Sequence, residues 1–456
     1  MKQRTMRILI PTGHLGTVPF KLDSFRRGME TGPDFVVADA GSSDPGPVFL
    51  GADIPLGFFE RDDLEQMLVA SRQQGIPMLV GSAGDSGANS RVDWFVSLIK
   101  ELAQKHEIPR FKLGYFYSEV PKEYLMQKIQ DGRSIDGLGG FPPLTMDEIE
   151  GTDRIVGVAG IHPFIKLLDM GADVIIGGRC GDIAFTAAPA IRAGFPEGLA
   201  YHMGKMLECA SLCAEPFMGK ETVIGTISEE DIKLTPYHPD QRCTVASAGA
   251  HSMYERESPF YEYALGGMLD MRECAFEQFD ERTCRISGAR WIPSAEMRVK
   301  IEGARKVGER YIGITAIRDP HLVQHVDEVI QWSRESVKEN FGQTGYELHY
   351  HVFGKNGVLK DLEPVKEIRS HELCVVAEGV AANGELAERI TDFATRMMFF
   401  VRIPGVKGTA GAAAFIEKRP MRATPSYVWS INHTVPVDDP MELFPVHLTE
   451  AGVGGA

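Results

Sequence analysis

Four short stretches of this sequence combine glycine with side chains that can move protons or hold an anion. Each follows a short apolar run: the runs are 7–10, 35–38, 77–80 and 172–176, and the stretches are 12–16, 39–47, 81–89 and 177–182. Glycine lets the backbone approach a ligand closely, while Ser, Asp and His supply hydroxyl, carboxylate and imidazole groups. This combination suits the binding of a small organic acid and proton transfer to or from it.

The first stretch reads Gly13-His14-Leu15-Gly16. It lacks the G-x-G-x-x-G spacing of a dinucleotide-binding loop, so no NAD site is expected. Its backbone N–H groups, with Gly13 among them, can still bind a carboxylate or phosphate at a helix N-terminus. His14 is predicted to donate a hydrogen bond or to act as a base. A histidine that is only hydrogen-bonded within the loop is the alternative.

The second stretch packs two carboxylates and two hydroxyls into one loop: Asp39, Ser42, Ser43 and Asp44. These oxygens can bind a hydroxy acid, with Ser42 and Ser43 as substrate ligands. They can also hold a divalent cation such as Mg²⁺ or Mn²⁺ through Asp39 and Asp44. A cluster of Asx turns, started where Asp44 precedes Pro45, is the competing interpretation.

The third and fourth stretches follow the same pattern. Their predicted substrate-binding residues are Ser82, Gly84, Asp85 and Asn89, and then Gly178 and Arg179, with Asp182 as a catalytic candidate. Arg179 is expected to clamp a substrate carboxylate through two parallel hydrogen bonds. A simple ion pair between Arg179 and Asp182 is the alternative.

Two further pairs have helical spacing. His251 and Glu255 are four residues apart, which would put them one turn apart on one helix face as a coupled acid and base or as metal ligands. They do not form an H-E-x-x-H zinc motif. Lys205 and Glu208, three residues apart, are predicted to form an ordinary solvent-exposed pair.

The elements that position these groups alternate between strand and helix in the first part of the chain. Helical patterns cover 62–74 and 93–105 between the apolar runs. This alternation predicts an α/β fold with a mostly parallel sheet. Ligands of such sheets bind at the carboxyl ends of the strands, so the four glycine-containing stretches should meet in one cleft.

The pattern changes near residue 295. Extended and helical segments then follow in the order β-α-β-β-α-β: 297–317, 319–340, 347–353, 372–378, 384–400, and extended pieces near 412–415 and 428–431. This order is typical of a ferredoxin-like α+β domain. The sequence therefore predicts an α/β domain over 1–295 and a smaller domain over 296–456.

Composition limits the classes of partner. The chain has 456 residues, 48 Lys and Arg against 63 Asp and Glu, and a net charge of −15 without a basic patch. Nucleic acids and anionic membranes are therefore not expected as partners. There is no signal-peptide core, no apolar run near the ~20 residues of a membrane span, and seven cysteines without a CxxC pair. We expect a cytoplasmic protein with reduced thiols.

Several motifs together resemble one protein family. They are Gly41-Ser-Ser-Asp-Pro-Gly-Pro, Leu207-Glu-Cys, Ala250-His-Ser-Met-Tyr-Glu, Gly266-Gly and Thr409-Ala-Gly-Ala-Ala-Ala-Phe. In order and spacing the chain resembles the acyclic terpene utilisation AtuA family. The resemblance implies an N-terminal α/β domain, a ferredoxin-fold domain behind it, a role in catabolism through acyl-CoA intermediates, and a short partner protein. The stretch 413–420 and the polar loop 39–47 differ from the terpene-pathway pattern and favour a smaller polar acid.

These observations predict a catabolic lyase or hydro-lyase, or an isomerase, that removes a proton next to a carboxylate. The proton carrier would be His251 or His14, oriented by Glu255, Asp85 or Asp182, and the substrate would be held by the amides of Gly13, Gly84 and Gly178 and by Arg179. The alternative is a non-catalytic subunit that binds an acyl-CoA or organic acid. A homo-oligomer is the general expectation for an enzyme of this kind.

Overall fold

The computed structural model describes residues 4–41, 45–52, 59–256, 258–408 and 411–454. The chain forms two compact units. The first comprises Met1–Ala304 together with Trp429–Ala456, and the second comprises Arg305–Val428. The last residues of the chain, expected in the second domain, thus belong to the first unit, because a strand near the C-terminus pairs with a strand of its sheet.

The first unit is built on a ten-stranded sheet with the order β12-β13-β9-β8-β1-β2-β3-β7-β4-β20. Its five neighbouring parallel strands are β1 (Met6–Ile10), β2 (Phe35–Asp39), β3 (Met78–Gly81), β7 (Val174–Ile176) and β4 (Phe111–Phe116). In this region Ile8 pairs with Phe35, and Met78 pairs with both Val36 and Val174. The predicted strand runs are therefore neighbours in one sheet.

Antiparallel strands extend this sheet on both sides. They are β8 (Val223–Ile227), β9 (Ile232–Pro236), β12 (Ala275–Gln278) and β13 (Cys284–Ser287) on one side and β20 (Val446–Ala451) on the other. Four residues join β8 to β9, a connection too short to return the chain for parallel pairing. The sheet is mixed, so the prediction of a mostly parallel sheet was wrong for its outer strands.

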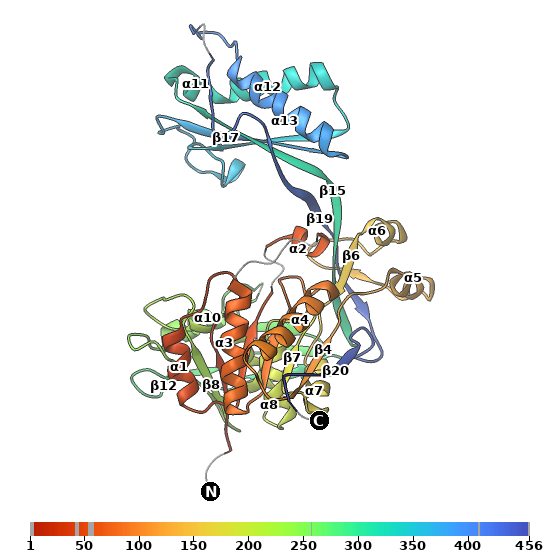
Figure 1. Cartoon of the computed structure of the whole chain (residues 1–456), viewed down its shortest axis with the longest axis vertical. Coiled ribbons are helices and arrows are strands. Elements are labelled where there is room, and N and C mark those ends of the chain that lie inside the picture. The colour runs from red at the N-terminus through yellow and green to blue at the C-terminus, as the bar shows by residue number, and fades with distance from the viewer. Residues whose placement is uncertain (1–3, 42–44, 53–58, 257, 409–410, 455–456) are drawn as a thin grey trace. The chain divides into compact units, whose positions relative to one another are not determined.

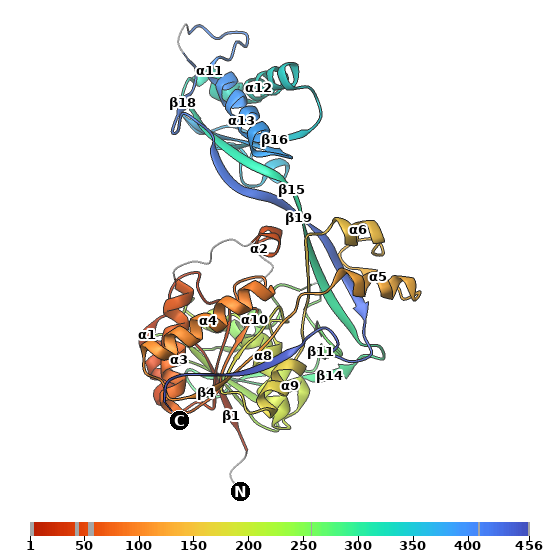
Figure 2. The same cartoon turned by 45° about the vertical axis from the view of Figure 1, so that its right-hand side comes forward.

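Helices cover both faces of this sheet (Figures 1 and 2). One face carries α1 (Leu22–Glu30), α3 (Phe59–Gln74) and α4 (Asn89–Lys105), and the other carries α7 (His162–Asp169), α8 (Ala184–Arg192) and α9 (Glu197–Leu207). Side chains alternate between the two faces along each strand. Leu9 and Val36 therefore pack in the first layer, while Ile8 and Val37 pack in the second.

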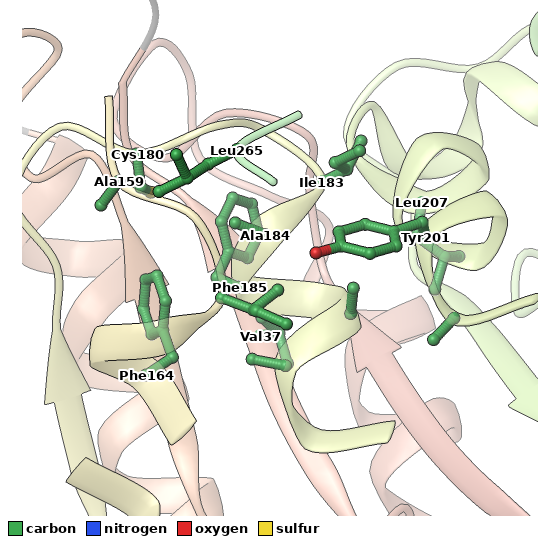
Figure 3. Packing of buried hydrophobic residues seen from close by; sticks show 14 of the residues in the cluster. Val37, Ala159, Phe164, Cys180, Ile183, Ala184, Phe185, Tyr201, Leu207 and Leu265 are labelled. Carbon is green, nitrogen blue, oxygen red and sulfur yellow. The ribbon is translucent and has the colours of Figure 1, made fainter. Parts of the chain in front are cut away.

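The core beneath the strand ends is closely packed on the α8 side (Figure 3). The ring of Phe185 lies against Gly81, where an added Cβ would come within 2.3 Å of the ring. The Phe164 and Phe185 ring centroids are 6.4 Å apart. Glycine at the end of β3 thus makes room for an aromatic ring directly below the third glycine-containing loop.

The remaining elements of the first unit are short. A three-stranded sheet consists of β10 (Tyr261–Ala264), β11 (Gly267–Asp270) and β14 (Arg290–Pro293). The others are α2 (Pro47–Gly51), α5 (Lys122–Gln130), β5 (Asp136–Gly137), α6 (Met146–Gly151), β6 (Arg154–Gly157), the 3-10 helix η1 (Ala210–Cys213) and α10 (Val245–Ser252). A capping box at Thr244 begins α10.

The second unit consists of helices packed on antiparallel strands. Its elements are β15 (Arg298–Ile317), which begins in the first unit, α11 (Pro320–Gln324), α12 (Val326–Phe341), β16 (Tyr346–Phe353), η2 (Lys360–Leu362), β17 (Leu373–Ala381), α13 (Gly384–Phe399), β18 (Ala414–Phe415) and β19 (Met421–Pro436). The strand order is β16-β17-β15-β19. Val329 and Ile390 from the helices share one buried core with Val375 of β17. Across the described residues, no helix is long and apolar enough to cross a membrane.

Candidate active site

The four glycine-containing loops are joined to one another by backbone hydrogen bonds. Leu15 N donates to Asp39 O (2.9 Å), and Asp85 N donates to Ala40 O (2.8 Å). Ala83 N donates to Gly177 O (2.9 Å), which links the third loop to the fourth. The loops meet because β1, β2, β3 and β7 are adjacent and parallel, so their carboxyl ends lie at one sheet edge.

Two glycines allow this close contact between loops. A Cβ on Gly41 would lie 2.2 Å from the carbonyl oxygens of Ser82 and Asp85. A Cβ on Gly87, whose φ is +60°, would lie 2.1 Å from Arg179 N. These positions require glycine so that backbone can pack on backbone.

A cavity of about 300 Å³ opens beside these loops. It is lined by Thr12, Gly13, His14, Asp39, Asp182, Glu208, Cys209, Ser211, Leu212, Phe217, Gly219, Lys220, Tyr254 and Glu255. This lining brings together five residues predicted from sequence: Gly13, His14, Asp39, Asp182 and Glu255. Its volume is at the lower end of the range for small-molecule sites.

His14 and Asp85 form a hydrogen-bonded pair at this cavity. His14 Nε2 lies 3.0 Å from Asp85 Oδ1, and the His14 side chain is about a quarter exposed. Asp85 has a φ of +67°, a left-handed conformation that is uncommon for a residue other than glycine. Because Nε2 faces the carboxylate, the remaining ring nitrogen, Nδ1, is the one available to a ligand. Asp85 is therefore placed to orient His14 rather than to contact the ligand itself.

Asp39 contributes a buried carboxyl group to the same cavity. Its side chain accepts a hydrogen bond from Gly41 N (3.2 Å), and the residue is 6% exposed. Burial, reinforced by the negative charge of Asp182, raises the pKa of Asp39 well above its usual range, although Arg179 acts in the opposite sense. Asp182 has a half-exposed side chain at the cavity. The site thus contains a carboxyl group that favours its protonated form.

Arg179 is held within the protein. Its Nε donates to Glu302 Oε2 (2.9 Å), and its Nη1 donates to Ser82 Oγ (3.3 Å) and lies 3.6 Å from Asp182 Oδ1. The charges of Arg179 and Lys300 outweigh burial and lower the pKa of Glu302 to about 2. Arg179 is not among the residues that line the cavity. The predicted clamp on a substrate carboxylate is therefore corrected. The guanidinium of Arg179 joins the third and fourth loops to Glu302 of β15, and it also lies near Asp182, as the alternative of a simple ion pair expected.

The other predicted substrate-binding residues support the loops. Gly178 N donates to Phe116 O (3.0 Å), so this amide does not point to a ligand as predicted. Asn89 Oδ1 accepts hydrogen bonds from Ser118 N and Glu119 N (both 3.3 Å). Ser82 Oγ accepts one from Cys180 N (3.2 Å), and Gly84 lies in the same buried loop. Ser42, Ser43 and Asp44 lie outside the described residues.

The predicted helical pairing of His251 with Glu255 was wrong. Helix α10 ends at Ser252, and Glu255 has a φ of +54°, so the two residues do not share one helix face. His251 is buried and stacks on Tyr254 with ring centroids 4.7 Å apart. Burial and the positive charges of Lys205 and Arg256 lower the pKa of His251 to about 4. His251 thus lies behind Tyr254, while Glu255 lines the cavity.

Sequence reasoning missed the wall of the cavity formed where α9 ends. Lys205 and Glu208, predicted to be solvent-exposed, form a buried ion pair. Cys209 Sγ lies 2.6 Å from Tyr254 Oη. Burial lowers the pKa of Lys220, whose Nζ donates to His14 O (2.6 Å). The apolar residues on all sides of 197–207 were the available signal, because a helix that is apolar all round is buried.

A metal centre was predicted from Asp39 and Asp44. Within the described ranges, no group of three or more His, Cys, Asp or Glu side chains is arranged to hold a metal ion, and Asp44 lies outside them. The predicted metal site at Asp39 and Asp44 therefore stays a prediction. No chemical step is assigned to a metal here.

Fold and site define a mixed α/β protein with acid–base groups at the carboxyl edge of its parallel strands. A model of the acyclic terpene utilisation family protein AtuA matches residues 58–435. The chain belongs to this family, which confirms the resemblance seen in the sequence. No curated protein and no solved structure matches the chain.

Proposed function

We propose that this protein is a catabolic enzyme, a lyase of the hydro-lyase type or an isomerase, that removes a proton next to the carboxyl group of a small acid. The observation that carries the proposal is the His14–Asp85 pair at the cavity. A base held in hydrogen-bond contact with an orienting carboxylate is the arrangement that proton abstraction requires.

The base in this scheme is His14. Its Nε2–H donates to Asp85, which fixes the tautomer and leaves the lone pair of Nδ1 to accept the substrate proton. The carboxylate of Asp85 stabilises the imidazolium that forms. This role corresponds to that of the aspartate in a catalytic triad, which orients and stabilises the histidine without taking up a proton itself.

Asp39 and Lys220 are proposed to bind the oxygen atoms of the substrate and to stabilise the negative charge that develops on them. The raised pKa of Asp39 favours the protonated form of its carboxyl group, which can donate a hydrogen bond to the substrate carbonyl oxygen as enolate charge develops. Lys220 lines the cavity and is held by the His14 carbonyl. Its ammonium group would pair with the carboxylate of the substrate or, in a thioester, with the carbonyl oxygen.

The cavity suits one small acid or the acyl end of a thioester. A volume of about 300 Å³ is at the small end for a ligand site. The family description concerns the utilisation of acyclic terpenes, so we assign the reaction to carbon-source breakdown of this general kind. The polar loop 39–47 supports a small polar acid as substrate.

A non-catalytic acyl-binding subunit is the second candidate. Two apolar side chains at the cavity, Leu212 and Phe217, are 40% and 69% exposed. Such exposed apolar groups at a pocket are suited to the tail of an acyl ligand. This candidate predicts ligand binding without proton exchange.

Exchange of substrate hydrogen with solvent tests the proposal. The protein is incubated in D₂O with 3-hydroxybutanoate, but-2-enoate, malate and fumarate, and with the CoA esters of the first two, and deuterium next to the carboxyl group is measured by NMR. We expect exchange that H14Q abolishes. H106Q is the matched control, because His106 also pairs with a carboxylate, Glu65, but at the surface. If a probe raises the melting temperature of the protein but its hydrogen does not exchange, the proposal of an enzyme is overturned and the non-catalytic binding subunit is favoured.

We further infer that residues 305–428 form a ferredoxin-like domain and that the protein comprises two domains. The order β15-α12-β16-β17-α13-β19 along the chain and the sheet order β16-β17-β15-β19 support this fold. We also propose that the protein forms a homo-oligomer together with a small partner protein. Light scattering of the protein, purified with and without a co-expressed candidate partner, tests this.

A further inference from the structure

Helix α9 ends in a buried ion pair that the proposed reaction has not yet used. Lys205 and Glu208 are bonded through Nζ and Oε1, and their side chains are 5% and 7% exposed. Every residue from Gly198 to Leu207 is buried. Charged residues are rarely buried in this way, because desolvation costs several kcal/mol per ion. A pair of this kind therefore points to a specific role.

This pair reaches the cavity through Glu208. Glu208 lines the cavity, and its second carboxyl oxygen, Oε2, has no hydrogen-bond partner among the described residues. Gly13 brings the first loop onto this segment, since a Cβ there would lie 2.5 Å from Cys209 Cα and 2.9 Å from Glu208 O. Glu208 and His14 are thus brought to the same cavity from different elements.

The surroundings of Glu208 hold its carboxyl group in place. Lys205 Nζ lies 4.5 Å from the centre of the Tyr254 ring, and Tyr254 Oη contacts Cys209 Sγ. Behind this layer, Arg256 Nη2 lies 3.3 Å from Glu262 Oε2. Burial raises the pKa of Glu208 to about 8 despite the attraction of Lys205. The carboxyl group can therefore carry a proton near neutral pH and release it.

We propose that Glu208, positioned by Lys205, is the second proton-transferring group of this cavity and delivers a proton to the hydroxyl that leaves the substrate. This inference rests on the proposed function, in which His14 removes the first proton. It makes Glu208 a catalytic residue and Lys205 a positioning residue. It also selects dehydration and its reverse, hydration, as the reaction class.

The step balances without an oxidant or a cofactor. His14 Nδ1 takes the proton next to the carboxyl group, and the electron pair of that C–H bond becomes the new C=C bond. The C–O bond on the neighbouring carbon breaks, and the Glu208 proton joins the leaving hydroxyl to form water. The imidazolium of His14 then returns its proton to solvent, and Glu208 takes one up.

Covalent labelling tests the place of Glu208 without a known substrate. Oxirane-2-carboxylate is a small acid with an epoxide, which an ionised carboxylate opens by attack on carbon while the ring oxygen gains a proton from water. The labelling is run at pH 9, above the pKa of Glu208, so that its carboxyl group is ionised. We expect one adduct, located by peptide mass spectrometry at Glu208, that is absent in E208Q and retained in E208D. The matched control E101Q changes an exposed surface carboxyl that does not line this cavity and should retain the label. Labelling at another carboxylate, or none, would overturn the inference.

A change of leaving group tests the role as proton donor. The wild-type protein and its variants are compared on 3-hydroxybutanoate and 3-chlorobutanoate, because chloride leaves without a proton. We expect E208Q to lose water elimination by about a hundredfold or more while it retains chloride elimination. H14Q should lose both. A structural defect would lower both rates in E208Q, so this pattern separates catalysis from folding.

The outcomes distinguish the two proposals. Wild-type protein that neither exchanges nor eliminates with either probe overturns the proposed function and this inference with it. Wild-type protein that exchanges, together with E208Q that eliminates water at the wild-type rate, overturns the inference alone.

Discussion

The Nε2 atom of His14 lies 3.0 Å from Oδ1 of Asp85, although the two residues follow different strands with β2 between them. The contact depends on the left-handed backbone of Asp85, with φ at +67°. Non-glycine residues adopt this conformation at a cost of order 1 kcal/mol, and such strain is concentrated at functional sites. The surrounding loop hydrogen bonds hold it in place.

Replacement of Asp85 by Asn should lower catalysis with little effect on the fold. D85N keeps the shape of the side chain but removes the charge that orients His14 and stabilises its imidazolium. We expect the rate of proton exchange to fall by about a hundredfold or more. The matched control is D169N, a surface carboxylate paired with Arg192. Exchange by D85N at the rate of D169N would contradict the role of Asp85.

Gly41→Ala should destabilise the protein, because the added Cβ would lie 2.2 Å from two backbone oxygens of the third loop. Overpacking of this kind typically costs about 1–3 kcal/mol in the free energy of unfolding. Gly249→Ala is the control with the opposite sign. No atom lies within 4 Å of that Cβ position, which is in helix α10, so alanine should stabilise by about 0.5–1 kcal/mol. Equal changes in the free energy of urea unfolding for the two variants would show that position 41 does not need glycine for contact between the loops.

Loss of Arg179 should affect stability rather than substrate affinity. R179M leaves the buried carboxylate of Glu302 with Lys300 as its remaining cation and should cost about 3–5 kcal/mol in the free energy of unfolding. The double variant R179M/E302M should recover part of this loss, because neither charge is then left buried without its partner. Thermal and urea unfolding measure both effects. If R179M is instead as stable as the wild type but has a raised KM, the result would support the prediction that Arg179 binds the substrate carboxylate.

Glu208 should make stability depend on pH. Its folded pKa of about 8 lies above the ordinary value of 4.5, so between these values the unfolded chain has lost a proton that the folded chain keeps. The contribution of Glu208 to the free energy of unfolding is therefore largest below pH 4.5 and falls as pH rises, by at most about 1.4 kcal/mol per pH unit. E208Q removes this dependence. If the free energy of unfolding of the wild-type protein and of E208Q changes with pH in the same way, the pKa of Glu208 is not raised.

Much of the fold followed from local pattern. Short apolar runs ending in glycine predicted β1, β2, β3 and β7, because side chains buried on both faces of a parallel sheet give continuous apolar strands. The same logic predicted that their loops meet. The outer antiparallel strands and the return of 446–451 to β4 were not predicted, because pairing between distant segments leaves no periodic trace in either.

Within the site, residue types indicated which groups can do chemistry but not which of them touch. His14, Asp39 and Asp182 were named from their loops and do line the cavity. Arg179 looked like a ligand clamp because its partner Glu302 lies far away in the sequence. His251 and Glu255 looked like a helical pair because the end of α10 at Ser252 has no glycine or proline to mark it.

By itself, the sequence determined the family, the strand-end loops and the candidate acid–base residues, since each of these depends on residue types and short spacings. The tertiary structure alone decided that His14 pairs with Asp85, that Arg179 is used within the fold, and that Lys205 and Glu208 are buried beside the cavity. The reason is physical. Whether a charged side chain becomes a ligand, a support or a proton carrier depends on its burial and its partners, and both arise from packing between segments that are remote in the chain.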